Sequence, residues 1–336
     1  MSTLFYEDFH VGWTETYGPL KVTQDAIIRF AKEYDDQPFH TDPEAAKHTF
    51  PGRLISSGWH SCALANRLLV EHLFLITTSQ GSPGIEAARW ISPLYPDDEV
   101  HLTVSVIEAR TLKSRPTLGM LKMSLELKKQ DGSLSTVMTG TVFLKRRHPD
   151  EEYYQLENLT FPAKKADSAA EKPIPQSAIL FLEEFIPGTT FDLGSHLFSS
   201  EEIIRFAREF DPQYFHTDAA AAKDSLFGGL CASGWNTAAN WMRQTSKLAR
   251  RLEKEMLEAG IPVPAQGPSP GFTNLKWLKP VFANDTISYC TTVTQTRASA
   301  SRPGWGLLSC HNTGNNQNGE RVFEFDSIVF RQMKSR

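Results

Sequence analysis

The 336-residue chain has no hydrophobic run long enough to cross a membrane, because none of its apolar stretches reaches about 18 residues. Its first residues also lack a basic stretch followed by an apolar core, so we expect no signal peptide. The final Lys-Ser-Arg differs from the Ser-Lys-Leu peroxisomal signal. These absences predict a soluble, cytoplasmic protein with no membrane span.

Cysteine is also scarce, and basic residues are not in excess over acidic ones. The four cysteines, at positions 62, 231, 290 and 310, are scattered, and no two have the spacing of a zinc site or a disulfide framework. The net charge is −4, so we expect no strongly basic face. The composition therefore favours a reducing compartment and a partner other than nucleic acid.

The chain does contain a nine-residue motif that occurs twice. Residues 34–42 read YDDQPFHTD, and residues 210–218 read FDPQYFHTD, 176 positions later. The match runs without a gap from residue 5 to residue 60, and it resumes at an offset of 187. Because a repeat of this length decides the architecture, we expect two related domains, at residues 1–146 and 180–333. A polar connector at residues 147–179 would join them.

Each copy has the pattern of one short helix, one long helix and several strands. Thr23 and Ser199 are placed to cap the short helix, and Glu202 predicts a capping box in the second copy. A longer helix from about residue 57 is apolar on several faces, which predicts burial. Asp131-Gly132 and Asn318-Gly319 predict hairpins between the later strands. The predicted class is α+β, with an antiparallel sheet wrapped around one buried helix in each half.

The second copy is longer than the first. The change of offset places eleven additional residues between residues 236 and 271. The proline-rich stretch there makes residues 253–270 the expected site of the insertion.

The repeated motif resembles that of the MaoC-type dehydratases and (R)-specific enoyl-CoA hydratases, which carry Asp-x-Asn-Pro-x-His. The two copies read Asp35-Asp-Gln-Pro-Phe-His40 and Asp211-Pro-Gln-Tyr-Phe-His216. The resemblance covers nearly all of both copies and implies two fused hotdog domains, each a curved antiparallel sheet around a central helix. Gln replaces Asn in both motifs, and Tyr214 replaces Pro in the second.

The resemblance also implies an activity, the addition or removal of water at the C2–C3 bond of an acyl-CoA. This reaction needs a base for water, an acid for C2 and a donor for the charge that builds on the thioester oxygen. Asp and His can divide the proton transfers, and a backbone N–H at a helix start can stabilise the oxygen. The expected catalytic residues are Asp35, His40, Gly58, Asp211, His216 and Gly234.

Other residues are expected near the substrate. Ser57, Trp59, Ser233 and Trp235 flank the two glycines, although large aromatics usually pack in cores. Arg115 and Arg302, in the repeated Ser-Arg-Pro, are candidates for the CoA phosphates or are solvated turn residues. We expect no cofactor, since the substrate carries the CoA.

Several polar residues have simpler interpretations. Asp42 and Asp218 precede Ala-rich segments and are expected to be helix N-caps. A metal site from His40, Asp42 and His48 is not expected, because the second copy has Asp224 in place of His48. His60 is Asn236 in the second copy and is expected on the helix surface.

Alternative functions remain open at this point. The substrate could be a branched or dicarboxylic acyl-CoA, as in mesaconyl-CoA hydratases. A non-catalytic acyl-CoA-binding module is possible, but it would not need Asp and His in both halves. A thioesterase is disfavoured because residues 57–66 contain no acidic residue. The sequence leaves open the length of the acyl chain, the number of active halves and the direction of the reaction. It also leaves open whether CoA or acyl carrier protein carries the acyl group, and whether the protein forms a homo-oligomer.

Overall fold

The computed structural model describes residues 3–148 and 173–334, and in both ranges the repeat folds into the same series of elements. The helices of the first half are α1 (Gln24–Tyr34), α2 (Pro38–Thr41), α3 (Pro43–Ala46) and α4 (Gly58–His72). Its strands are β1 (Thr14–Lys21), β2 (Gly84–Trp90), β3 (Glu99–Leu112), β4 (Arg115–Lys129) and β5 (Leu134–Lys145).

The second half repeats this series with two differences, a 3-10 helix at Ala221–Asp224 in the place of α3 and an additional short strand at Ile174–Pro175. Its helices are α5 (Ser200–Phe210), α6 (Tyr214–Thr217) and α7 (Gly234–Glu258). Its strands are β6 (Ile174–Pro175), β7 (Thr190–Leu197), β8 (Gly271–Trp277), β9 (Thr286–Ala298), β10 (Trp305–Asn315) and β11 (Arg321–Gln332).

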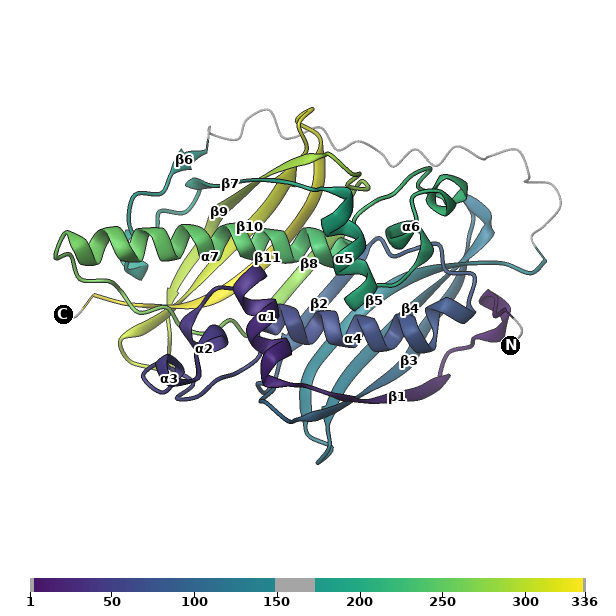
Figure 1. The fold of residues 1–336 in the computed structure, drawn as a ribbon, viewed down its shortest axis with the longest axis horizontal. Coiled ribbons are helices and arrows are strands. Elements are labelled where there is room, and N and C mark those ends of the chain that lie inside the picture. Colours follow the sequence, from purple (N-terminus) through teal and green to yellow (C-terminus); the bar gives the residue numbers. More distant parts are fainter. Residues whose placement is uncertain (1–2, 149–172, 335–336) are drawn as a thin grey trace.

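Within the described ranges, all the strands join into one sheet in the order β1-β3-β4-β5-β2-β8-β11-β10-β9-β7-β6. The halves meet where β2 pairs with β8 in antiparallel fashion, from Gly84 opposite Lys276 to Arg89 opposite Gly271. The long helices α4 and α7 lie across the same face of the sheet (Figure 1). This is the predicted α+β arrangement of two hotdog units, each with a central helix.

The registers show how closely the halves agree. Trp90 of β2 pairs with Thr136 of β5, and Trp277 of β8 pairs with Phe323 of β11. Both pairs are related by the offset of 187 that the sequence showed. A residue in one half therefore has a definite counterpart in the other.

Most predicted helix starts are confirmed, with one correction. The Thr23 and Ser199 hydroxyls accept hydrogen bonds from Ala26 N and Glu202 N. The predicted capping box is wrong, because the Glu202 carboxylate contacts His196 at 2.8 Å and accepts from the Asn240 amide at 2.9 Å. A partly buried carboxylate gains more from these donors than from one exposed N–H.

The additional residues of the second half are mostly helix. Helix α7 has 25 residues, whereas α4 has 15. The extension buries Leu252 and Met256 against Ile179, at the end of the predicted connector. Residues 149–172 of that connector lie outside the described residues, and the predicted domain boundaries stay predictions. In the described part of the chain, no helix is long and apolar enough to span a membrane.

Candidate active site

Two clusters of buried polar residues lie where the repeated motifs meet the central helices. The first site consists of Asp35, His40 and Gly58. In the first site, Asp35 ends α1 and His40 lies on the short helix α2. These side chains are nearly inaccessible, with the two residues exposing 3% and 5% of their surfaces. Burial of a carboxylate and an imidazole is costly unless hydrogen bonds compensate, so their partners define the chemistry.

The second site consists of Asp211, His216 and Gly234. It repeats the first site, with Asp211 at the end of α5 and His216 on α6. Asp211 is 5% exposed and His216 is 6% exposed. The replacement of Pro38 by Tyr214 changes neither short helix, because both residues occupy the first helical position and Tyr214 points outward with 46% exposure.

Each carboxylate is held by two neutral donors. Ser57 Oγ donates to Asp35 Oδ2 at 2.6 Å, and Gln37 Nε2 donates to Oδ1 at 2.7 Å. In the second site, Ser233 and Gln213 make the same bonds to Asp211, at 2.6 and 2.9 Å. Donors to both oxygens compensate for burial of the ionised form and fix the direction in which each carboxylate points.

The tautomer of each histidine follows from a backbone carbonyl. His40 Nδ1 lies 2.8 Å from the Ile55 carbonyl, and His216 Nδ1 lies 2.7 Å from the Cys231 carbonyl. A carbonyl oxygen only accepts, so Nδ1 carries the proton in both rings. Burial lowers the pKa of both His40 and His216 below the ordinary value, against the raising effect of the adjacent aspartate and of the carbonyl. The neutral form therefore presents a lone pair on Nε2.

That lone pair faces the aspartate. His40 Nε2 lies 3.5 Å from Asp35 Oδ2, and His216 Nε2 lies 3.6 Å from Asp211 Oδ2. A neutral imidazole nitrogen and an ionised carboxylate are both acceptors, so neither can donate to the other. A molecule with two O–H donors satisfies both at once, and water is the smallest such molecule.

The central helices begin beside these acceptors. Gly58 and Gly234 are the first residues of α4 and α7, and Ser57 and Ser233 cap them by accepting from Trp59 N and Trp235 N at 3.2 Å. The first N–H of an α-helix has no partner within the helix and lies at the positive end of the helix dipole. Each site thus combines two acceptors, the aspartate and the histidine, with a helix N-terminus. The serine hydroxyl bonds both the aspartate and the helix N-terminus.

Comparison with known proteins agrees with this geometry. A family model described as MaoC like domain matches residues 14–123 and again residues 183–303. The chain belongs to the MaoC-like family. The uncharacterised protein YdeM of Bacillus subtilis (strain 168) is 33% identical over 139 residues, a match that covers 39% of this chain and 96% of that protein.

Two solved structures share the architecture over the whole MaoC-like chain. A protein of Chloroflexus aurantiacus J-10-fl, described as a MaoC domain dehydratase, has a TM-score of 0.79 at 15% identity, covering 99% of this chain and 98% of that one. A conserved hypothetical protein of Mycobacterium tuberculosis, described as having a double hotdog fold, has a TM-score of 0.63 at 13% identity, covering 98% of both chains. At these identities the likeness establishes the double hotdog fold alone.

The remaining predicted contact residues have different environments. Trp59 and Trp235 are buried in the core, at 6% and 5% exposure. Arg302 places its guanidinium carbon 4.7 Å from the ring centre of Phe50, which follows α3 in the other half. Arg115 begins β4 and is half-buried, which lowers its pKa. Arg302 therefore lies beside the loop that leads to the first site.

One expectation about the helix surface is wrong. His60 is 1% exposed, its Nδ1 lies 2.8 Å from Ser56 Oγ, and its ring stacks on Phe30 at 4.7 Å. The pKa of His60 is lowered to about 3, mainly by burial and in part by electrostatic interactions with Arg29 and His40. Helix α4 is packed on nearly every side in its first turns, so sequence position alone could not identify an exposed face.

Two pairs of residues were not predicted to take part in these MaoC-like sites. Gln37 and Gln213 hold the aspartates, although the sequence showed them only as departures from the family motif. Trp90 and Trp277 lie so close to Gly58 and Gly234 that a Cβ on either glycine would overlap the indole ring. The glycines thus have a packing role beside the one expected from the resemblance, and the shared offset of the tryptophans was the available signal.

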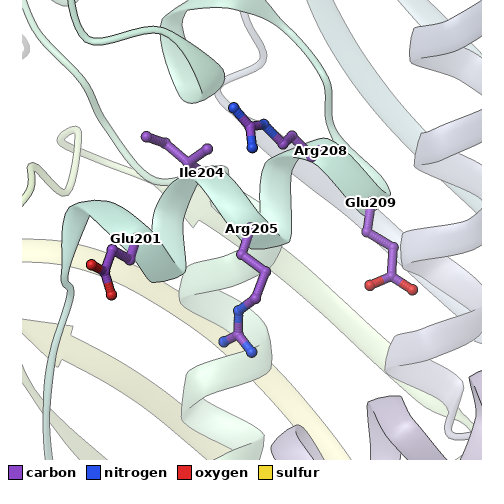
Figure 2. Close-up of a pocket in the computed structure, with 5 residues that line it drawn as sticks. All are labelled: Glu201, Ile204, Arg205, Arg208 and Glu209. Atoms are coloured by element: carbon purple, nitrogen blue, oxygen red, sulfur yellow. The ribbon is translucent and has the colours of Figure 1, made fainter.

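A surface hollow lies away from both sites. It measures about 550 Å³ on the outer face of α5, and the residues that line it all belong to that helix (Figure 2). They are Glu201, Ile204, Arg205, Arg208 and Glu209. Arg205 pairs with Glu33 of α1, and Arg29 pairs with Glu209 at 2.5 Å, so charges here join the two halves. The residues that line the hollow include neither an aspartate nor a histidine.

Proposed function

We propose that the protein adds water to the C2–C3 double bond of an enoyl thioester, or removes water from the 3-hydroxyacyl thioester in the reverse direction. One observation carries this proposal, the pair of acceptors 3.5–3.6 Å apart in each site. Membership of the MaoC-like family supports it. The catalytic residues we propose are Asp35, His40 and Gly58 in the first site and Asp211, His216 and Gly234 in the second.

The acceptor pair is suited to hold and activate one water molecule. Water donates one O–H to the aspartate and one to the histidine Nε2, which leaves its oxygen lone pairs free to attack C3. As the C3–O bond forms, one of the two acceptors takes a proton, and the π electrons move toward the thioester oxygen. The same pair then returns a proton to C2, so the product gains one complete water molecule.

The helix start is suited to the thioester oxygen. The N–H groups of Gly58 and Gly234 have no acceptor among the described residues. A donor aimed at an oxygen that becomes negative stabilises the transition state more than the substrate. We propose that the thioester carbonyl binds there, with the C2–C3 bond over the water site.

The carrier of the acyl group is proposed to be CoA. Arg302 supports this assignment because its guanidinium lies beside Phe50, on the loop between α3 and α4 that leads to the first site. Guanidinium groups pair well with phosphate oxygens. A redox cofactor or a metal has no part in the proposed reaction.

The direct experiment is product analysis with crotonyl-CoA in water enriched in oxygen-18. We expect 3-hydroxybutyryl-CoA with the label on C3 and no release of free CoA. Free CoA thiol without the hydroxy product would indicate a thioesterase. Acyl-CoA binding without any product, across straight, branched and dicarboxylic enoyl-CoAs, would indicate a binding module and would contradict the proposal.

A further inference from the structure

A small apolar cavity lies against the second site but inside the first half of the molecule. Its volume is about 40 Å³. Its walls include Asn66, Leu69, Ile85 and Met138 from the first half, and Trp235 and Trp277 from the second. Trp235 follows Gly234, and the indole of Trp277 packs against that glycine. The cavity therefore starts beside the helix N-terminus at which a thioester would bind.

A hydrogen bond fixes this cavity to the second site. Asn66 Nδ2 of α4 donates to the carbonyl of Phe210 at 2.9 Å, and Phe210 directly precedes Asp211. Most of the other wall residues have aliphatic or thioether side chains, and the lining also includes Phe74, Ser82 and Thr141. An acyl tail that leaves the second site through this opening would lie among apolar groups, as hydrocarbon burial favours.

The equivalent region beside the first site is filled by aromatic rings. Trp59, the counterpart of Trp235, stacks on Phe272 with ring centres 4.8 Å apart. It also meets Phe325 at 5.6 Å and Trp241 at 6.0 Å, both edge-on. These three partners belong to the second half and expose 1–8% of their surfaces. They occupy the volume into which a tail from the first site would extend.

Three exchanges between the halves account for this difference. The registers of the sheet and the common helix start make Ile85 the counterpart of Phe272, and Met138 the counterpart of Phe325. On the central helices, Ala65 of α4 corresponds to Trp241 of α7. Each exchange places a larger, rigid ring in the second half. The catalytic groups themselves match between the sites.

We propose that the two sites accept different acyl groups, with a linear acyl tail bound only by the second site, in the cavity of the first half. The first site is restricted to the shortest enoyl groups by Trp241, Phe272 and Phe325. The cavity holds at least one carbon-sized group as it stands. Longer tails displace the flexible side chain of Met138, whereas rigid rings cannot yield in the same way. This inference rests on the hydratase activity proposed above.

The size of the effect follows from hydrocarbon burial. Each buried methylene is worth about a fourfold change in an equilibrium constant. Going from a four-carbon to a six-carbon enoyl group adds two methylenes. The second site should therefore favour the longer substrate by roughly fifteenfold relative to the first site, and by more if the rings exclude it outright.

The test uses single-site enzymes. Asp35→Asn leaves only the second site and Asp211→Asn leaves only the first, and both are assayed with crotonyl-CoA and trans-2-hexenoyl-CoA. We expect the ratio of kcat/KM for hexenoyl to that for crotonyl to be at least about tenfold higher for Asp35→Asn. Equal ratios in two active enzymes would overturn the proposal. Loss of all hydration in both enzymes and in the parent would instead overturn the hydratase activity.

Exchange variants locate the cause. In the Asp211→Asn enzyme, Phe325→Met with Phe272→Ile should raise the hexenoyl ratio of the first site. In the Asp35→Asn enzyme, Met138→Phe should lower the ratio of the second site. If the first pair unfolds the protein, the second variant still decides, because Met138→Phe requires no deletion of an aromatic ring. An unchanged ratio in a folded Met138→Phe enzyme would contradict the assignment of the cavity.

Discussion

At the scale of single residues, Ser57 and Ser233 connect the carboxylates of Asp35 and Asp211 to the helix starts. Each hydroxyl donates to the aspartate at 2.6 Å and accepts from the N–H of the following tryptophan at 3.2 Å. Ser57→Ala with Ser233→Ala should lower the unfolding free energy by about 1 kcal/mol per cap. Turnover should fall roughly tenfold or more, because the carboxylate loses a charge-assisted bond.

Denaturant unfolding and initial rates would measure these two effects. Ser61→Ala is a matched control, because Ser61 is buried on the same helix and bonds the Ser57 carbonyl rather than the aspartate. A serine pair that can be removed without loss of turnover would show that the aspartates do not depend on it.

The histidines of the two sites predict the pH dependence of the rate. Burial lowers the pKa of His40 and His216, so the neutral imidazole persists below pH 6.5, the usual value for this side chain. Hydration should therefore stay constant as the pH falls to about 6.5, and should decline only at lower pH, where Nε2 takes up a proton. A pH–rate profile that already declines above pH 7 would contradict this assignment.

His60 predicts a different dependence, that of stability on pH. Its pKa is about 3 in the folded protein and about 6.5 when unfolded. Between these values only the unfolded chain binds the proton, so the unfolding free energy falls as the pH falls. His60→Asn, the residue of the second half, should reduce this slope by up to about 1.4 kcal/mol per pH unit.

Urea unfolding at several pH values between 4 and 7 would measure that slope. The surface variant His10→Asn serves as the control, since His10 is exposed. Equal slopes for the parent and His60→Asn would mean that His60 is protonated within the folded protein.

At the scale of elements, the start of each central helix is fixed by an indole ring. A Cβ at Gly58 would overlap Trp90, and one at Gly234 would overlap Trp277. Gly58→Ala should therefore cost about 1–3 kcal/mol of stability through overpacking. Adding Trp90→Val should recover part of that loss by making space. Because alanine keeps the N–H, turnover of the first site in an Asp211→Asn enzyme should recover with the packing.

Thermal or urea unfolding would measure the recovery of stability, and crotonyl-CoA hydration would measure the recovery of turnover. Gly229→Ala is the control, since its new Cβ would meet Phe282 at an ordinary distance of 3.7 Å. If stability returns in the double variant and turnover does not, the backbone at Gly58 has a role that packing alone cannot explain.

The elements also show what the sequence could and could not predict. The capped helices, the Asp-Gly and Asn-Gly hairpins and the buried central helices follow from local patterns, and the structure confirms them. The Glu202 capping box was wrong because His196 and Asn240 reach the carboxylate from other elements. The insertion was expected at residues 253–270, and the structure places most of it slightly earlier, in the extension of α7 that ends at Glu258.

Prediction of the two sites from the sequence was limited in the same way, by contacts between distant elements. Asp35, His40 and Gly58 were predicted because a family motif and its copy share them. Gln37 was interpreted only as a departure from that motif, and Trp90 packs on a glycine 32 positions earlier in the chain. Contacts between elements distant in sequence decide both roles, and no local pattern contains them.

At the scale of the whole molecule, duplication combines two matched Asp–His clusters with two unmatched neighbouring regions, a small cavity beside the second cluster and packed aromatic rings beside the first. One continuous sheet and paired charges between α1 and α5 hold the halves together. The tail of a substrate in one half would lie in the other half. The fusion therefore allows each environment to change independently, which two identical subunits could not do.

The most direct test of the account is hydration of crotonyl-CoA by Asp35→Asn/Asp211→Asn, compared with the two single variants and the parent. Each single variant should keep measurable turnover from its intact site. The double variant should lose about 10²–10⁴-fold while it remains folded. A folded double variant that hydrates crotonyl-CoA at the rate of the parent would contradict the assignment of the two aspartates.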